Sequence, residues 1–150
     1  MSWKALLADN RVEAHTTSRQ ELDGLRSAAD RTLHDAALPE LSADNKLGLA
    51  YEAALLMAKM AIACAGYRVK GYGAHQTTFV ALELAMGPAV SKEAAYFDSC
   101  RRKRHTLSYD TAGVATDTEA AEILERATRF RQTGEDWISK HHPGLSRPLR

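Results

Sequence analysis

Residues 47–65 read LGLAYEAALLMAKMAIACA, and this apolar stretch decides the fold. Apolar side chains recur through it at the three- and four-residue intervals of a helix face. The members of this stripe are Leu47, Ala50, Tyr51, Ala54, Ala58, Ala61, Ile62 and Ala65. Further leucines and methionines extend the apolar surface around the cylinder, which is typical of a helix in the centre of a bundle. We therefore expect a central helix that opens at Ser42 and ends near Gly66.

Shorter helical segments are predicted on the N-terminal side of this helix. Residues 3–14 show a short and weak helical pattern. Ser18 and Glu21 have the spacing of a capping box, in which each residue satisfies a free N–H group of the first helical turn. A second helix is therefore expected from Ser18, and Pro39 ends it.

Three further helices are predicted on the C-terminal side. Residues 67–74 carry two glycines and are interpreted as a loop, whereas residues 75–86 and 91–109 are interpreted as helices. Thr116 and Glu119 form a second capping box, which opens the last long helix. No segment alternates between apolar and polar residues as a half-buried strand does. We expect an all-α, up-and-down bundle of four to six helices.

Length and composition fit one ordinary globular domain. The chain has 150 residues, of which 45% are hydrophobic and 26% are charged, and a disordered chain would have fewer apolar residues. We therefore expect a single helical domain over residues 1–150, with a frayed tail at 141–150. The formal net charge of +1 argues against a protein that coats nucleic acid non-specifically.

The expected location of the protein is the cytoplasm. Residues 1–4 lack the apolar core of a signal peptide. The longest apolar stretch, residues 53–66, contains Lys59 and is too short to span a bilayer, so no membrane partner is expected. The two cysteines, Cys64 and Cys100, cannot make a disulfide framework and are interpreted as buried thiols.

Basic side chains are concentrated in one run, residues 101–104. On a helix, Phe97, Cys100, Arg104 and Leu107 fall on one inward-facing stripe. Arg104 therefore occupies a place where the fold would take a leucine, and an unpaired buried guanidinium is costly. Two alternatives remain open. In the first, Arg104 has a structural role and either forms a salt bridge in the interior or reaches the surface. In the second, Arg104 lines a groove and binds phosphate.

A polar row runs beside this stripe. Arg101, His105 and Tyr109 are successive neighbours at four-residue spacing. Arginine supplies paired donors for a phosphodiester, and histidine can move a proton near neutral pH. Spacing alone favours a plain solvated helix face that ends in a tyrosine packed on the last helix.

No metal or cofactor is expected. His141 and His142 are adjacent, so they do not share a helix face, and no acidic or cysteine partner lies at ligand spacing. The chain also contains no phosphate-binding loop, dinucleotide fingerprint or nucleophile elbow.

Seven short motifs follow one another from the central helix onward. They are AYEAA at 50–54, AKMA at 58–61, AGYR at 65–68, GAH at 73–75, RRKRH at 101–105, YD at 109–110 and TEAA at 118–121. Their order resembles that of the HEPN family (higher eukaryotes and prokaryotes nucleotide-binding) over residues 46–138, most of the chain. The order of the motifs and the basic run followed by a tyrosine carry the resemblance.

The resemblance implies a bundle of helices, commonly dimeric, that acts on or binds nucleotides or RNA. Active HEPN proteins are metal-independent ribonucleases with an arginine, a polar residue after it and a histidine a few positions later. Arg104 matches the arginine and His105 the polar position, whereas Tyr109 stands where the histidine is expected. Arg104, His105 and Tyr109 are thus the candidate catalytic residues. Arg101, Arg104 and Asp110 are the candidate phosphate- or nucleotide-binding residues.

A tyrosine at the histidine position weakens the case for catalysis, because a phenol with a pKa of about 10 is a poor general base at neutral pH. We prefer a non-catalytic HEPN-like module that binds nucleotide or RNA, or that pairs with a minimal nucleotidyltransferase. A HEPN-type ribonuclease, for example the toxin component of a toxin–antitoxin pair, comes second. A helical scaffold that only dimerises comes last. A homodimer is expected, with the polar row facing a cleft between the subunits.

Overall fold

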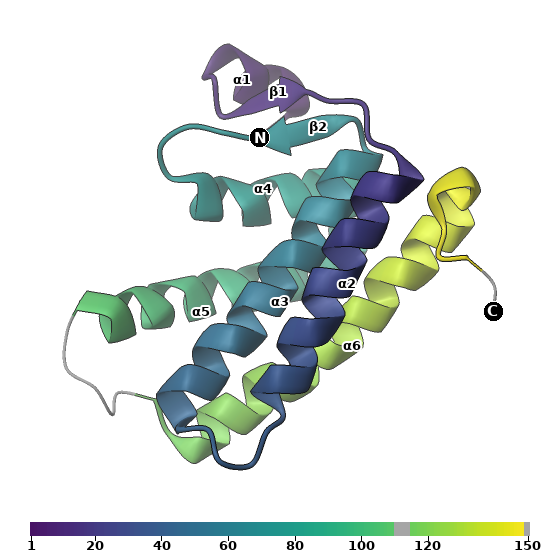
Figure 1. Ribbon diagram of the computed structural model, residues 1–150. Helices are drawn as coiled ribbons and strands as arrows, with labels where there is room; N and C mark the ends of the chain where they lie inside the picture. Colours follow the sequence, from purple (N-terminus) through teal and green to yellow (C-terminus); the bar gives the residue numbers. More distant parts are fainter. Residues whose placement is uncertain (110–114, 149–150) are drawn as a thin grey trace.

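Six α-helices and one small sheet make up the described part of the chain (Figure 1). The computed structural model describes residues 1–109 and 115–148, except for the side chains of residues 106–109. The helices are α1 (Trp3–Ala8), α2 (Arg19–Ala36), α3 (Ala43–Cys64), α4 (Ala74–Met86), α5 (Ser91–Tyr109) and α6 (Asp117–His141). The remaining elements are the strands β1 (Val12–Ala14) and β2 (Tyr67–Val69) and the 3₁₀ turns η1 (Pro88–Val90) and η2 (Pro143–Leu145). The predicted bundle of packed helices is confirmed.

Helix α3 is the centre of the fold, as its sequence predicts. It contacts α2, α4, α5, α6 and β2. Figure 1 shows α2 and α6 running alongside α3, whereas α4 and α5 lie across it. The side chains of Tyr51, Leu55, Met57 and Ile62 on this helix are less than 2% exposed. Each such burial stabilises the fold by about 1.5–3 kcal/mol, so α3 holds the other helices in place.

By length and composition alone, α3 is also able to cross a membrane. In this fold, 72% of its most apolar part is buried inside the protein. The core helix of a bundle and a membrane-spanning helix share this composition, because both place apolar side chains all round the cylinder.

The two strands are a departure from the prediction, which contained none. They pair antiparallel, with Val12 opposite Val69. The loop predicted over 67–74 is therefore wrong for its first three residues, and the helix predicted over 3–14 covers only the first part of that segment. Strands of three residues are too short to show the alternation by which a strand is found in a sequence.

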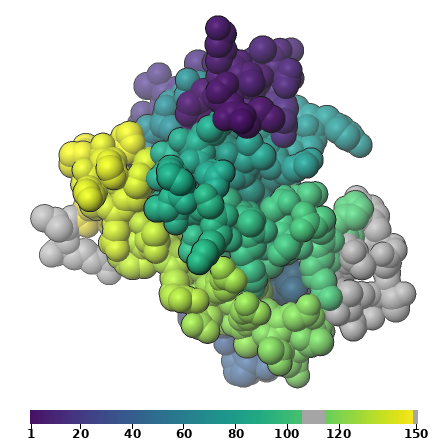
Figure 2. Space-filling view, turned by 180° about the vertical axis from the view of Figure 1, so that it is seen from behind, coloured from purple at the N-terminus to yellow at the C-terminus, as the bar shows by residue number. Residues whose placement is uncertain are grey.

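The N-terminal segment and the sheet cover one end of α3 and α4. A small apolar cluster joins them, and its buried members are Leu6, Val12, Ile62 and Ala81. Beside this cluster, the rings of Trp3 and Tyr67 stack with 4.1 Å between their centroids. Seen from behind, the N-terminal residues in purple lie directly above the teal residues of the middle of the chain (Figure 2).

Hydroxyl side chains cap the N-termini of α2, α3 and α6. The Oγ atom of Ser18 accepts a hydrogen bond from the N–H of Glu21 at 3.1 Å, and Ser42 caps α3 in the same way. Thr116 and Glu119 form the complete capping box that the sequence predicts at α6. At α2 only the serine half of the predicted box is present, because the carboxylate of Glu21 bonds side chains that precede the helix.

A group of ion pairs joins α2 to α6. Arg26 of α2 is 4% exposed and bonds both carboxylate oxygens of Glu135, at 2.8 and 3.1 Å. Arg131 reaches the same carboxylate at 3.2 Å and Asp30 at 2.9 Å. These pairs satisfy two guanidiniums that the helix packing removes from water.

The tail expected at 141–150 begins with the last residue of α6 and continues into η2. The carbonyl of Leu145 accepts a hydrogen bond from Arg26 at 2.6 Å, and Arg147 pairs with Asp30 at 3.3 Å. Leu145 and Arg147 thus contact α2.

Gly134 lets α6 approach α3 closely. A Cβ atom added to Gly134 would lie 2.5 Å from Sδ of Met57 and 2.9 Å from its Cγ. The helix glycines Gly24 and Gly48 differ, because nothing lies within 4 Å of a Cβ built on either of them. A packing role therefore explains Gly134 but not the other two.

Candidate functional site

Arg104 lies against α3 at the edge of a pocket. Its guanidinium carbon is 5.4 Å from the centroid of the Tyr51 ring, a distance at which the ring face attracts a cation. The side chain is half-buried, and no carboxylate among the described side chains forms an ion pair with it. The interior salt bridge considered for Arg104 is therefore absent from the part of the chain that the structure describes.

The pocket has a volume of about 330 Å³ and lies where α3, α4 and α5 meet. Its lining comes from Tyr51 of α3, residues 73–76 at the start of α4, and Arg101, Arg104 and His105 of α5. Figure 1 shows how α4 and α5 cross α3 next to one another. Their crossing brings the first turn of α4 next to the basic run of α5.

Residues 73–76, at the start of α4, line this pocket. Gly73 precedes the helix with φ 73°, a left-handed conformation that glycine adopts readily, and no side chain caps the helix. The first N–H groups of a helix have no carbonyl partner within it. They carry the positive end of the helix dipole, so an anion in the pocket would be stabilised from this side.

Tyr51 and His75 are joined at the base of the pocket. The Tyr51 hydroxyl lies 3.2 Å from Nδ1 of His75. Burial raises the pKa of Tyr51, although Arg104 lowers it, so the hydroxyl keeps its proton at neutral pH. Burial, followed by the charge of Arg104, lowers the pKa of His75. The ring is therefore neutral at neutral pH, and whichever role Nδ1 takes toward Tyr51, Nε2 takes the opposite one.

Other charges act on His75 in both directions. The carboxylate of Glu52 favours the protonated ring, whereas Lys59 and Arg101 disfavour it. Each of these effects is smaller than that of burial, and the cations together with Arg104 outweigh Glu52, so the pKa of His75 stays below its ordinary value.

Asp98 compensates part of the positive charge of α5. One of its oxygens bonds Nε of Arg101 at 2.8 Å, and the other bonds Nη1 of Arg102 at 2.7 Å. One carboxylate is thus shared between two guanidiniums. With Arg104 added, the side of α5 that lines the pocket keeps a net positive charge.

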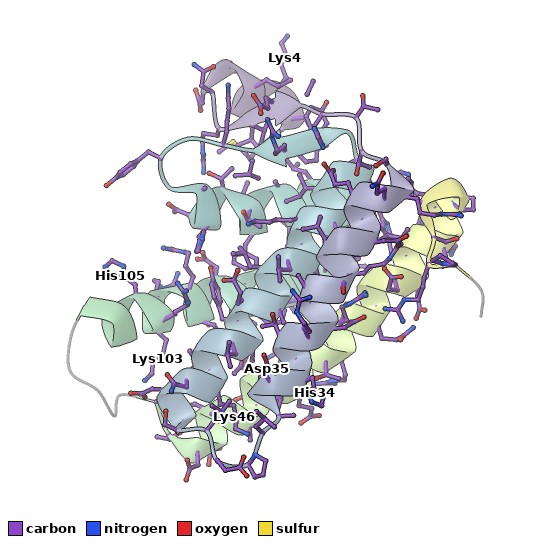
Figure 3. All side chains as sticks on the ribbon, viewed as in Figure 1. Lys4, His34, Asp35, Lys46, Lys103 and His105 are labelled. Atoms are coloured by element: carbon purple, nitrogen blue, oxygen red, sulfur yellow. The ribbon has the colours of Figure 1, made fainter. Side chains whose placement is uncertain are left out.

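The basic run divides between two sides of α5. Arg101, Arg104 and His105 line the pocket, whereas Lys103 pairs with Glu119 of α6 at 3.3 Å. Figure 3 shows Lys103 and His105 on opposite sides of the helix. Three of the predicted site residues are therefore brought together.

The two remaining predicted site residues are not tested by this geometry. Tyr109 is the last residue of α5, and its side chain is not among those described. Asp110 lies outside the described residues. His141 and His142 lie at the other end of α6, where both rings contact Trp137.

Comparisons of the chain with known protein families, curated proteins and solved structures gave no match. Within residues 1–109 and 115–148, no group of three His, Cys, Asp or Glu side chains is placed to hold a metal ion. Guanidiniums, a neutral imidazole and free helix N–H groups form a site complementary to a phosphate-sized anion.

Sequence reasoning missed two residues of the pocket, Tyr51 and His75. The sequence pattern places Tyr51 in the apolar stripe of the central helix and identifies His75 only as the start of a helix. A signal for Tyr51 was present, since a tyrosine in a fully buried stripe needs a hydrogen-bond partner for its hydroxyl. Nothing in the spacing identified His75 as that partner, because the two residues lie on different helices.

Proposed function

We propose that this protein is a HEPN-like domain whose pocket binds a phosphate group of a nucleotide or of RNA. One observation carries the proposal. The motifs at 50–54, 73–75 and 101–105, which resemble HEPN sequences, lie on three different helices, and each contributes residues to the same pocket. Motifs that were independent in the sequence thus converge on one site.

The charge of the pocket supports a phosphate as its ligand. Arg104 has no carboxylate partner among the described side chains, and a guanidinium matches a phosphate with paired hydrogen bonds. Arg101 and the start of α4 add positive potential from two further directions. The volume of about 330 Å³ is at the lower end of small-molecule sites, which suits a phosphate with its sugar better than a large cofactor.

Calorimetric titration with AMP, ATP and a short single-stranded RNA tests the proposal. Arg104→Gln should weaken binding of at least one of these at least about tenfold, because it removes a charge-assisted hydrogen bond. Arg102→Gln is the matched control, since it removes the same charge from a residue of the same run that does not line the pocket. Absence of binding to the wild type, or equal losses in the two variants, would contradict the proposal.

A metal-independent ribonuclease is the second candidate, and the position of His75 favours it. The family histidine is replaced by Tyr109, but His75 is neutral and lines the same pocket as Arg104. A neutral imidazole is the usual base for a hydroxyl proton at neutral pH. In this mechanism Arg104 binds the scissile phosphate, and His75 is in the tautomer in which Nδ1–H donates to Tyr51, so that Nε2 takes the proton of the RNA 2′-hydroxyl. The 2′-oxygen bonds to phosphorus as the bond to the 5′-oxygen breaks. The 5′-oxygen leaves with a proton from solvent, and a 2′,3′-cyclic phosphate remains.

Incubation with transfer RNA in EDTA tests this second candidate. Cleavage should occur in the wild type and in Arg102→Gln, and it should be lost in both Arg104→Gln and His75→Gln. Cleavage that persists in both of the latter variants would come from a contaminant. No cleavage by the wild type would leave the non-catalytic binding module as the function.

Partners are proposed on the resemblance. HEPN-like bundles are commonly dimeric, so we propose a homodimer with the pocket facing a cleft between the subunits, and an alternative pairing with a minimal nucleotidyltransferase. Light scattering at micromolar protein concentration measures the molar mass in solution and so tests the homodimer. Finding only the monomer would exclude the homodimer. A dimer that binds none of the ligands above would favour a scaffold instead.

A further inference from the structure

A second pocket opens in a different part of the molecule and shares no residue with the first. Its volume is about 430 Å³, within the range of sites that bind small molecules. It lies where the first half of α2, the last turns of α3 and the strand β2 meet (Figure 1). Nothing in the proposed phosphate chemistry uses this pocket.

The walls of the second pocket are mainly apolar. They include Leu25 of α2, Ile62 and Ala63 of α3, and Val69 of β2. Ile62 is 1% exposed and belongs to the apolar cluster beneath the sheet. Because core packing holds these side chains in place, the pocket is formed before any ligand arrives.

Gly24 keeps part of this pocket open. It lies within α2 and lines the pocket, and no atom lies within 4 Å of a Cβ built on it. A glycine inside a helix destabilises that helix relative to alanine. No close packing explains the glycine here, and its missing side chain leaves volume for a ligand.

The charged groups around the pocket leave one cation available. The guanidinium of Arg68 is bound by Glu13. The carboxylate of Glu21 accepts a hydrogen bond from Nε2 of His15 at 2.8 Å. Lys59 also lines the pocket. It is exposed, and it makes no hydrogen bond or ion pair with any side chain that the structure describes.

We propose that the second pocket binds a small carboxylic acid with an apolar body. The carboxylate pairs with the ammonium group of Lys59, and the apolar body lies against Leu25, Ile62 and Val69. A neutral apolar compound would fill the same volume without the charge-assisted hydrogen bond. An apolar amine would bring a second positive charge to Lys59.

Calorimetry with octanoate, octanol and octylammonium at neutral pH tests this proposal. The wild type should bind octanoate with a submillimolar dissociation constant, octanol more weakly, and octylammonium not at all. Lys59→Met keeps the apolar stem and should weaken octanoate about tenfold, toward the affinity of octanol. Gly24→Leu should abolish binding, because its side chain occupies the pocket.

Gly48→Leu is the matched control. It also replaces a helix glycine that has open space around it, but it does not line this pocket, so octanoate affinity should be unchanged. Octanoate should also shift the amide NMR signals of Gly24, Ala63 and Val69 in the wild type, a result that needs no variant. The proposal is overturned by no binding at millimolar octanoate, by equal affinity for octanol, by unchanged binding to Gly24→Leu, or by NMR shifts elsewhere.

Discussion

The carboxylate of Glu135 bonds the guanidinium of Arg26 through both of its oxygens, at 2.8 and 3.1 Å, in the interior between α2 and α6. Arg131 contacts the same carboxylate at 3.2 Å. All three side chains are nearly inaccessible to solvent. A single carboxylate therefore pairs with two buried guanidiniums, and removing its charge would leave both of them incompletely paired.

Glu135→Gln should lower the free energy of unfolding by about 3 kcal/mol, since it leaves buried guanidiniums incompletely paired. We expect the lower end of the usual range because Asp23 and Asp30 still contact the two arginines. Urea denaturation at neutral pH measures the change. The control is Glu125→Gln, whose partner Arg129 is 69% exposed and which should change stability by less than about 0.5 kcal/mol. Equal effects of the two substitutions would contradict the prediction.

His75 should titrate below its ordinary pKa of about 6.5, because burial and then Arg104 disfavour the protonated ring. The folded protein binds this proton less tightly than the unfolded chain does. The neutral His75 ring therefore contributes its full stabilisation above the pKa that His75 has in the unfolded chain. This contribution is lost as the pH falls through the lower pKa that His75 has in the folded protein. The wild type should accordingly lose more stability than His75→Gln on acidification below pH 6.5.

Proton NMR of the imidazole measures the pKa of His75 directly, and His75→Gln identifies the signal. Arg104→Gln should raise this pKa, and phosphate bound in the pocket should raise it too, because an anion favours the protonated ring. Arg102→Gln should leave it unchanged. A pKa at or above the ordinary value in the free protein would show that the ring is not desolvated as described.

Gly134→Ala should destabilise the protein by about 1–3 kcal/mol, because its Cβ collides with the buried side chain of Met57. The same substitution in a Met57→Ala background should instead stabilise by up to about 1 kcal/mol, the ordinary gain from removing a helix glycine. Thermal unfolding of the four proteins of this double-mutant cycle measures the coupling. Gly48→Ala adds a Cβ atom that has no other atom within 4 Å, so it should stabilise the protein in both backgrounds. Additive effects at Gly134 and Met57 would refute the close approach.

Thr116→Ala should destabilise the protein by about 1 kcal/mol, because it removes the hydroxyl that caps α6. The reciprocal bond, which the Thr116 N–H donates to the Glu119 carboxylate, remains. Thr116→Ser retains the hydroxyl and should lie within about 0.5 kcal/mol of the wild type in chemical denaturation. A serine variant as unstable as the alanine variant would mean that the methyl group, and not the cap, matters.

The long helices could be predicted because their information is local. Apolar periodicity identified α3, and hydroxyl residues marked the starts of α2, α3 and α6. The strands β1 and β2 could not be predicted, since each has three residues and exists only through pairing with the other. Their stability comes from contacts between segments that are distant in the sequence, which a local pattern does not record.

The candidate site could be predicted only in part, because only part of its information is local. Arg104 could be recognised because its guanidinium stands in the apolar stripe of its own helix, where a leucine is expected. Arg101 and His105 followed from four-residue spacing, and the structure brings all three to one pocket. Tyr51 and His75 lie on other helices, and only the crossing of α3, α4 and α5 brings them to Arg104.

The pairing of Val12 with Val69 also sets an order of events during protein synthesis. The first fourteen residues leave the ribosome early but have no partner until β2 has emerged. In that interval the apolar side chains of Leu6 and Val12 remain uncovered, and contacts between distant segments form slowly. In a newly made chain, Leu6 and Val12 therefore stay open to aggregation and to chaperones until β2, and then α4 with Ala81, have been released.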